Sequence, residues 1–192
     1  GTVFGLLFNV LAAYALSRKD LVGKGLFLKI MVFTILFNGG LIPNYITVQK
    51  TGLMNTLGAL IIPGLFSAWH VLILKQFMEG IPRETEEAAE MDGVSQLGNL
   101  IYIVLPMSKA VLSAICMFTM VGHWNSWFDV SIYISDNALW TLQYYIKVNF
   151  DNTSGLNQGQ LDFIISQGSS VNSITMKMAL TVISVLPMLV LY

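Results

Sequence analysis

Charged residues are scarce in this 192-residue chain, where Asp, Glu, Lys and Arg make up 11% of the sequence against about 25% in a soluble domain. A single cysteine, Cys116, rules out an internal disulfide and a cysteine-based metal site. The net charge of −1 gives no basic patch for a nucleic acid. What is abundant is apolar sequence: the chain is 55% hydrophobic with a mean hydropathy of +0.67, a composition typical of membrane proteins.

Long apolar runs predict membrane spans, because a bilayer core of about 30 Å requires roughly 20 apolar residues in a helix. Five runs or part-runs predict about five spans, at residues 1–16, 26–42, 54–78, 97–122 and 174–192. Both chain ends lie inside such runs, so we expect a fragment truncated at both ends and six spans in the full protein. The predicted fold is all-α, a polytopic transmembrane helical bundle forming a single domain over residues 1–192.

Basic residues predict the orientation, because cytoplasmic loops are enriched in Lys and Arg. Seven lie in or near the first and third connections and three elsewhere: Arg18, Lys19, Lys24, Lys29, Lys75, Arg83 and Lys109 against Lys50, Lys147 and Lys177. The first and third connections are therefore predicted to be cytoplasmic. The second connection, residues 42–55, is expected to be an outer loop. The polar stretch 135–173 is expected at the outer face, with an interfacial helix over residues 138–150.

Carboxylates gather between the third and fourth runs, in and just before the stretch EEAAEMDGVSQLGNLIYIVLP from Glu86 to Pro106. Pro82 suits the first turn of a helix, and glutamates in the early turns suit the helix dipole. These signals predict a short helix over residues 83–92. Gly93 is expected to end it, because glycine adopts the left-handed conformation at little cost. Ser95 can cap a second helix that runs until Pro106 interrupts it.

The first predicted helix has one face suited to contact with another protein. On the 3.6-residue period this face holds Glu84, Glu87, Ala88 and Met91. It combines a carboxylate, a small side chain and a flexible apolar one. The alternative is an acidic surface helix that only joins two spans. We expect the outer carboxylates Glu84, Glu86 and Glu90 to be solvated and to suit the helix dipole.

The spacing of these residues matches a known motif that reads EAA, three residues, G, nine residues, I, one residue, L-P. The matching positions are Glu87, Ala88, Ala89, Gly93, Ile103, Leu105 and Pro106, and Asp92 supplies the acidic residue frequent before the glycine. The segment thus resembles the EAA motif of inner-membrane permease subunits of binding-protein-dependent ABC importers. Lys109 is a departure, because the family often has proline there.

Further stretches resemble the carbohydrate type of this family, similar to the maltose permease. They are AAYALSRKDLVGKG, LIPNYITVQKTGLMNT, LKQFMEGIPRETEEAAEMDG and HWNSWFD. The stretch LWTLQYYI looks closer to permeases for complex oligosaccharides. The resemblance covers nearly the whole chain and implies a multi-pass protein of the bacterial plasma (inner) membrane, surrounded by lipid.

The resemblance implies a subunit that forms the membrane path for a carbohydrate, an oligosaccharide. Its partners would be a second permease subunit, two ATPase subunits and an extracellular or periplasmic solute-binding protein. Residues 79–109 would be the coupling segment. Glu87 would meet a cationic or polar group of the ATPase, Ala88 and Ala89 would allow close seating, and Gly93 would hold the turn. Asp92, the acidic residue before the glycine, would belong to the same coupling set.

No catalytic residue, cofactor or metal is expected in the chain itself. ATP hydrolysis is expected on the partner, because the chain has no GxxxxGK[ST] sequence. Alternatives are an ABC importer permease for another solute and a non-ABC secondary transporter. Against the latter, the acidic residues avoid the span centres.

Polar and aromatic residues in or near the spans are candidates for a sugar path. Trp124 and Asn125 lie at the predicted outer end of the fourth run, where an aromatic belt is the alternative. Trp69 and His70 lie in mid-run, where a polar ring is expected to face the bundle interior. For His70 the alternative is a hydrogen bond to a neighbouring helix.

An intramembrane hydrolase is a further alternative. His123, Ser126 and Asp129 recur every three residues and would share one helical stripe. Catalytic triads are assembled across different elements, and no GxSxG sequence accompanies these residues. The pattern therefore does not favour a hydrolase.

Overall fold

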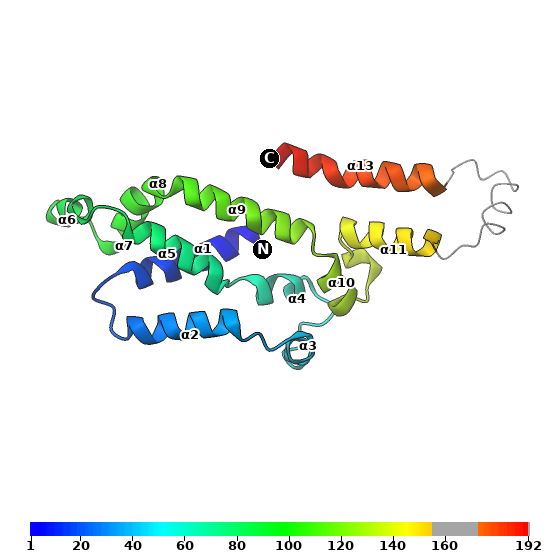
Figure 1. The fold of residues 1–192 in the computed structure, drawn as a ribbon, viewed down its shortest axis with the longest axis horizontal. Coiled ribbons are helices and arrows are strands. Elements are labelled where there is room, and N and C mark those ends of the chain that lie inside the picture. The colour runs from blue at the N-terminus through cyan, green and yellow to red at the C-terminus, as the bar shows by residue number, and fades with distance from the viewer. Residues whose placement is uncertain (155–172, 192) are drawn as a thin grey trace, which may run out of the picture.

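The computed structural model describes residues 1–154 and 173–191, and all regular elements in these ranges are helical (Figure 1). The predicted all-α class is confirmed. The first half holds α1 (Thr2–Ser17), α2 (Lys24–Leu36), α3 (Leu41–Lys50), α4 (Leu57–Ile61), the 3-10 helix η1 (Ile62–Gly64) and α5 (Ala68–Glu79). The second half holds α6 (Arg83–Met91), α7 (Gln96–Asn99), the π-helix η2 (Leu100–Val104), α8 (Leu105–Met107), α9 (Lys109–Trp124), α10 (Trp127–Tyr133), the 3-10 helix η3 (Asn137–Leu139), α11 (Leu142–Ser154) and α13 (Ser173–Leu191).

Among the described residues, no single helix is long and apolar enough to cross a membrane by itself. Three pairs of helices that meet at a bend satisfy the length and composition requirement together. They are α2 with α3, bent by 112°, the segments Leu57–Gly64 and Ala68–Glu79, bent by 44°, and the segments Gln96–Met107 and Lys109–Trp124, bent by 82°. Two shorter apolar helices, Thr2–Ser17 and Met178–Leu189, lie where the first and last spans were predicted. The predicted spans thus correspond largely to bent or short helices.

The third predicted run, residues 54–78, is not one continuous helix. The chain breaks between η1 and α5, and buried Asn9 of α1 contacts the break directly. Its Nδ2 donates to the carbonyl of Leu65 (3.1 Å), and its Oδ1 accepts from the N–H of Ser67 (2.9 Å). Ser67 caps α5 by accepting from the N–H of His70. The break is stable in an apolar region because Asn9 satisfies backbone groups that the helix leaves unpaired.

Within the second predicted run, α2 ends at Leu36, just before Asn38 and two glycines. The Asn38 Oδ1 accepts a hydrogen bond from the N–H of Gly40 (3.0 Å), and Gly40 has a left-handed φ of 85°. Asn38 therefore marks a helix end. The expectation of a loop over residues 42–55 is wrong, because α3 occupies most of this connection, whereas its position at the outer face stays a prediction. Its Pro43 lies in the first turn, where no intrahelical N–H donor is required.

The fourth run also departs from a simple helix interrupted at Pro106. Residues Leu100–Val104 form a π-helix, the helix continues through Pro106, and the sharp bend comes at Ser108. Pro106 lies in the first turn of α8, where its missing N–H is tolerated. The predicted interfacial helix over 138–150 is present as α11, shifted to begin at Leu142 and end at Ser154.

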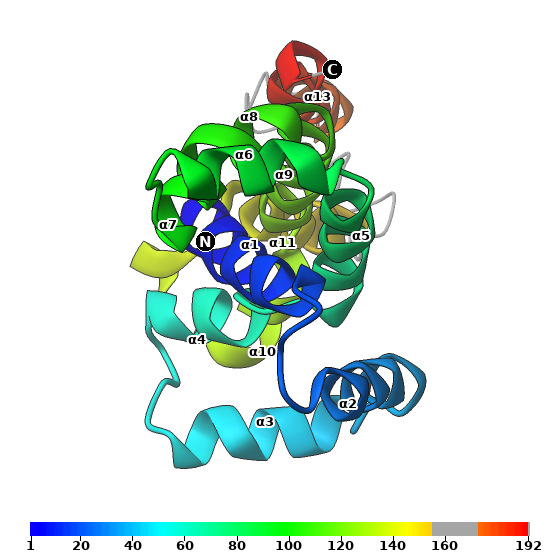
Figure 2. The same ribbon diagram turned by 90° about the vertical axis from the view of Figure 1, so that its left-hand side faces the viewer.

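Two hydrophobic clusters hold the helices together. The larger surrounds α1 and includes Val10, Ala13, Val71, Leu74, Leu100, Val104 and Ile115. The smaller joins α3, α4 and α10 through Val48, Ala59, Val130, Tyr133 and Ile134. Figure 2 shows α1 inside the bundle, with α2 and α3 set to one side. Helix α2 has no buried residue, so its apolar side chains are available to lipid or to another subunit.

Candidate functional site

The predicted coupling segment folds as helix, glycine turn and helix. Helix α6 ends at Met91, one residue earlier than expected, and Gly93 has a φ of 80°. The N–H of Val94 donates to the carbonyl of Ala89 (3.0 Å), which closes the helix end. Ser95 caps α7 by accepting from the N–H of Gly98 (3.2 Å). Local sequence signals predicted this turn because each of them acts within a few residues.

One face of α6 projects away from the rest of the chain. Glu84, Glu87, Ala88 and Met91 are all exposed, and Met91 is 89% exposed. Asp92 and Gly93 continue this exposed surface into the turn. Ala89 is buried, so its small side chain seats α6 on its own chain rather than on a partner. The exposed members of the predicted coupling set are thus Glu87, Ala88, Asp92 and Gly93.

The opposite side of α6 carries an ion pair that the sequence analysis missed. The Arg18 guanidinium, just after α1, donates to the Glu86 carboxylate, and the two side chains are 25% and 13% exposed. Glu86 was expected to be solvated, which is wrong. Its partner is 68 positions away in the sequence, so no local pattern indicates the contact.

Tyr14 extends this contact to the second helix of the segment. The Arg18 Cζ atom lies 4.2 Å from the centroid of the Tyr14 ring, a cation–π geometry. The Tyr14 hydroxyl donates to the carbonyl of Gln96, the first residue of α7 (2.9 Å). The end of α1 therefore contacts the helices on both sides of the Gly93 turn.

A second ionic group joins α2 to α5. Glu79 at the end of α5 accepts from Lys24 and from Lys75, both at 2.7 Å. A polar cavity of about 580 Å³ lies between the two ionic groups, and Arg18, Lys24, Glu79 and Glu86 are among the residues that line it.

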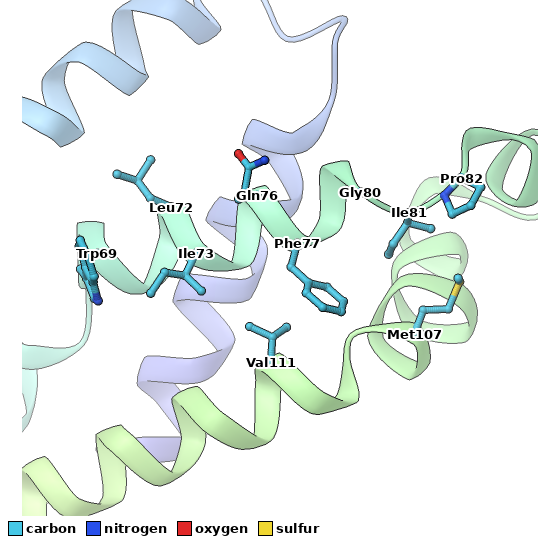
Figure 3. Close-up of a pocket in the computed structure, with 10 residues that line it drawn as sticks. All are labelled: Trp69, Leu72, Ile73, Gln76, Phe77, Gly80, Ile81, Pro82, Met107 and Val111. Carbon is cyan, nitrogen blue, oxygen red and sulfur yellow. The ribbon is translucent and has the colours of Figure 1, made fainter.

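An apolar groove of about 740 Å³ lies beside the coupling segment, between α5 and α9 (Figure 3). Phe77 points toward Val111 across it, and Trp69 lies at the far end (Figure 3). Trp69 is 62% exposed, so the expectation that its ring faces the bundle interior is wrong. Residues 69 and 70 are consecutive on one helix and diverge by about 100°, so Trp69 and His70 face different directions.

A pocket of about 690 Å³ lies toward the opposite end of the bundle, and we call it the polar pocket for the polar side chains in its otherwise mostly apolar lining. It is lined by residues of α3, α4, η1, α5, α9 and α10 and of the adjoining turns. Its polar lining consists of Asn44, Thr47, Thr51, His70, Thr119, His123, Ser126, Asp129 and Tyr133. Hydroxyl, amide and imidazole groups around such a volume can hydrogen-bond to the hydroxyls of a sugar.

Of the four predicted path residues, only His70 lines this pocket. The described residues provide no hydrogen-bond partner for its ring, so the alternative of a bond to a neighbouring helix has no support there. Trp124 instead donates from Nε1 to the carbonyl of Ser184 in α13 (3.2 Å). Asn125 is exposed at the end of α9. His123, which precedes Trp124 and Asn125 in the sequence, lines the pocket in their place.

The pocket residues that the sequence analysis missed do carry a spacing signal. Asn44, Thr47 and Thr51 follow the helical i, i+3, i+7 spacing, but their segment was interpreted as a loop. His123, Ser126 and Asp129 were considered only as a hydrolase triad. All three line the pocket, yet the Ser126 hydroxyl donates to the backbone carbonyl of His123 (2.8 Å) and not to its imidazole. This geometry does not activate a nucleophile.

Charge in the pocket is limited. Burial, followed by the nearby charge of Asp129, raises the pKa of the Tyr133 hydroxyl, which therefore stays protonated and able to donate at neutral pH. Within residues 1–154 and 173–191, no three His, Cys, Asp or Glu side chains converge as metal ligands.

Comparison with known proteins matches the whole chain, residues 1–192, to the family described as binding-protein-dependent transport system inner membrane component. The polygalacturonan/rhamnogalacturonan transport system permease protein YtcP of Bacillus subtilis is 37% identical over the whole chain, which covers 66% of that relative. Protein LplC of the same organism is 34% identical over the whole chain, which covers 64% of it. The chain thus spans about two thirds of the length of these relatives.

A solved structure has the same fold. It is the crystal structure of a bacterial ABC transporter involved in the import of the acidic polysaccharide alginate, with a TM-score of 0.89 and 29% sequence identity. The similarity covers all of this chain and 69% of that one. The bends and broken helices described above are therefore compatible with the architecture of a membrane transporter.

Proposed function

The chain belongs to the family of binding-protein-dependent transport system inner membrane components, and from this we propose that it is the permease subunit of an ATP-driven carbohydrate importer. Its substrate would be an oligosaccharide. The similar proteins support this class. The relative YtcP is named as a polygalacturonan/rhamnogalacturonan transport system permease protein, and the similar structure is of a transporter involved in alginate import. The polar pocket supports it with hydroxyl, amide and imidazole groups and the Asp129 carboxylate, all of which can hydrogen-bond to a sugar.

The observation that carries the proposal is the exposed face of α6 and its glycine turn. Glu87, Ala88, Asp92 and Gly93 form a surface that the other described residues leave open. We propose that an ATPase subunit binds this surface, with Glu87 as the charged contact and Ala88 as the point of close approach. A second permease subunit and a solute-binding protein would complete the transporter in the bacterial plasma membrane. Hydrolysis of ATP would take place on the ATPase.

The mechanism requires α6 to move with the ATPase. When the ATPase subunits close on ATP, the seated helix would shift as a rigid body, and the spans would change from inward-open to outward-open. Contacts must differ between the two states for coupling to occur. Loose seating would therefore separate ATP hydrolysis from transport.

The test is co-purification of the full-length permease with its ATPase subunit. Gly93→Val introduces a β-branched residue at a φ of 80°, where the added Cβ meets no neighbouring atom but the backbone is strained. We expect the ATPase to be lost. Gly52→Val is the matched control, because Gly52 has a φ of 71° and equally open surroundings but lies between α3 and α4.

Import is then measured in proteoliposomes with a panel of oligogalacturonide, alginate oligosaccharide and arabinooligosaccharide. Import that continues after removal of the ATPase subunit would show a secondary transporter and overturn the proposal. Loss of the ATPase in both glycine variants would show that the exposed face of α6 has no special role. Binding of the same panel to the cognate solute-binding protein would narrow the substrate class.

A further inference from the structure

We propose that Arg18 and Tyr14 clamp both helices of the coupling segment to the end of α1, so that α1 receives the ATPase-driven movement directly. The inference rests on the proposed function, because it assumes that an ATPase subunit moves α6. It assigns a positioning role to residues outside the EAA-like stretch. It also identifies which span moves first.

The covalent connections of the coupling segment do not favour transmission along the chain. Helix α6 joins α5 through Gly80, Ile81 and Pro82, where helical structure is interrupted. It joins α9 through the π-helix η2 and an 82° bend at Ser108. A movement of α6 can be absorbed at either junction, because the helix is interrupted between α5 and α6 and changes direction sharply before α9.

The lateral contact with α1 bypasses both junctions. Arg18 pairs with Glu86 on α6, and Tyr14 donates to Gln96 on α7. The Arg18 guanidinium lies over the Tyr14 ring, so the two contacts form one connected group. This group spans the Gly93 turn and holds α6 and α7 in a fixed relation to α1.

Because the ion pair is mostly buried, each of its charges depends on the other for compensation. Arg18 and Glu86 are mostly buried, and among the described residues Nε and Nη2 of Arg18 have no hydrogen-bond partner. Glu86 is thus the side chain that compensates the guanidinium charge. Removing either partner leaves a poorly solvated charge, which favours separation of α6 from α1.

Helix α1 is well placed to pass the movement on. It lies in the larger hydrophobic cluster with α5 and α9, and its Asn9 satisfies the break before α5. A shift of α1 therefore moves the break and the adjoining helices together, because packed cores respond as units. The clamp connects the ATPase contact to the centre of the bundle (Figure 2).

The test is the ratio of ATP hydrolysed to oligosaccharide imported, measured on the full-length transporter in proteoliposomes with the panel above. Arg18→Gln and Glu86→Gln are expected to raise this ratio about tenfold, because a charged hydrogen bond that holds the clamp is lost. Co-purification of the ATPase is expected to be unchanged. Arg18→Lys keeps the charge and is expected to recover most of the coupling.

Lys24→Gln is the matched control. Lys24 is a similarly buried cation that pairs with Glu79, but Glu79 keeps Lys75 as a partner, and the ion pairs of these residues link α2 and α5 and not α6. We expect the ratio of ATP hydrolysed to oligosaccharide imported in Lys24→Gln to match that of the unaltered transporter. A purely structural role for Arg18 predicts a smaller amount of assembled transporter with an unchanged ratio. An unchanged ratio in both glutamine variants, or an Arg18→Lys variant as uncoupled as Arg18→Gln, overturns the inference.

A distance measurement tests the clamp without import. Spin labels are placed at the exposed positions of Lys19→Cys and Thr85→Cys in a Cys116→Ser background of the assembled transporter. The label distance is expected to be equal in the nucleotide-free and ATP-bound states, and to differ between the states once Arg18→Gln is added. A distance that already changes with Arg18 present overturns the clamp. Failure of the proposed function is distinguishable, because no ATPase would then co-purify with the unaltered permease.

Discussion

The two ends of the bundle are held by different kinds of contact. At the end that carries α6, the connections between distant segments include the ion pairs Arg18–Glu86 and Lys24–Glu79. At the opposite end, α3, α4 and α10 meet in the smaller hydrophobic cluster (Figure 1), and one neutral residue, Asn55, adds hydrogen bonds between distant segments. The Asn55 N–H donates to the carbonyl of Tyr133, and its Oδ1 accepts from the N–H groups of Ser135 and Asp136 at 2.9 to 3.0 Å.

The difference corresponds to what each end is proposed to do. Backbone contacts through one amide fix a single geometry, because donor and acceptor directions are set by the main chain. Charged side chains attract each other over longer distances than neutral hydrogen-bonding groups do. The α6 end can therefore move with a partner while α1 stays attached to it. The Asn55 end keeps one wall of the polar pocket in place.

Asn55→Ala should have the largest effect on stability. It removes the acceptor for two N–H groups and places alanine at a φ of 58°, where a left-handed conformation is strained. Together these changes should lower the free energy of unfolding by about 2 to 3 kcal/mol. Thermal unfolding of the full-length subunit in detergent, followed by circular dichroism, measures the loss.

Two further substitutions at this position separate the contributions. Asn55→Gly relieves the backbone strain and should recover about 1 kcal/mol of the loss. Asn55→Asp keeps an acceptor and tolerates the left-handed conformation, so its stability should remain near that of the unaltered chain. If alanine and glycine destabilise equally, strain at Asn55 plays no part, and the contrast between the two ends rests on hydrogen bonds alone.

The Arg18–Glu86 pair should show the next largest effect. A double-mutant cycle with Arg18→Gln and Glu86→Gln should give a coupling free energy of about 1 to 2 kcal/mol, because the pair is partly buried and charge-assisted. Raising the salt concentration should reduce this value, whereas the loss in Asn55→Ala should hardly change. Equal salt sensitivity at both ends would contradict the proposed difference in contact chemistry.

How far the sequence could predict these features depends on how local the signals are. The limits of α6, the left-handed Gly93 and the Ser95 cap were predicted closely, because each depends on residues within one or two turns. The Arg18–Glu86 pair and the Asn9 contact with Leu65 could not be predicted, because they join residues 68 and 56 positions apart. No periodicity within a single helix encodes such a pairing.

The polar pocket illustrates an intermediate case. Asn44 and Thr47 have helical spacing, and so do His123 and Ser126, but each pair points into a pocket only once α3 and α9 are brought together. The break at Ser67 was missed because Leu57 to Glu79 is apolar enough to form one span. Its stability depends on Asn9, which lies in another helix. Trp124 was predicted as a residue of the sugar path from its chemistry, and that role stays a prediction. Its hydrogen bond to Ser184 of α13 depends on tertiary packing.

Trp124→Phe should have a smaller effect than either change above. The substitution keeps an aromatic ring but removes the Nε1 donor to the Ser184 carbonyl (3.2 Å), so the free energy of unfolding should fall by about 1 kcal/mol. The loss should be insensitive to salt, as expected for a neutral contact. Trp127→Phe is the matched control, because Trp127 is exposed and should tolerate the change. A larger loss in the control would show that packing of the ring, and not the indole donor, stabilises this region.

Asp151→Asn should have the smallest effect on stability. It tests whether the strength of an ion pair comes from its charge or from its burial. Lys147 and Asp151 form an ion pair at 2.7 Å on α11, but their side chains are 43% and 62% exposed. Water already solvates both groups, so removing the charge should change the free energy of unfolding by less than about 0.5 kcal/mol. Placed beside the Arg18–Glu86 cycle, this variant tests whether partial burial gives the α6 contact its strength. If Asp151→Asn lowered the free energy of unfolding by as much as the Arg18–Glu86 coupling free energy, an exposed ion pair would be as stabilising as a partly buried one. Burial of Arg18 and Glu86 would then not explain the strength of the α6 contact.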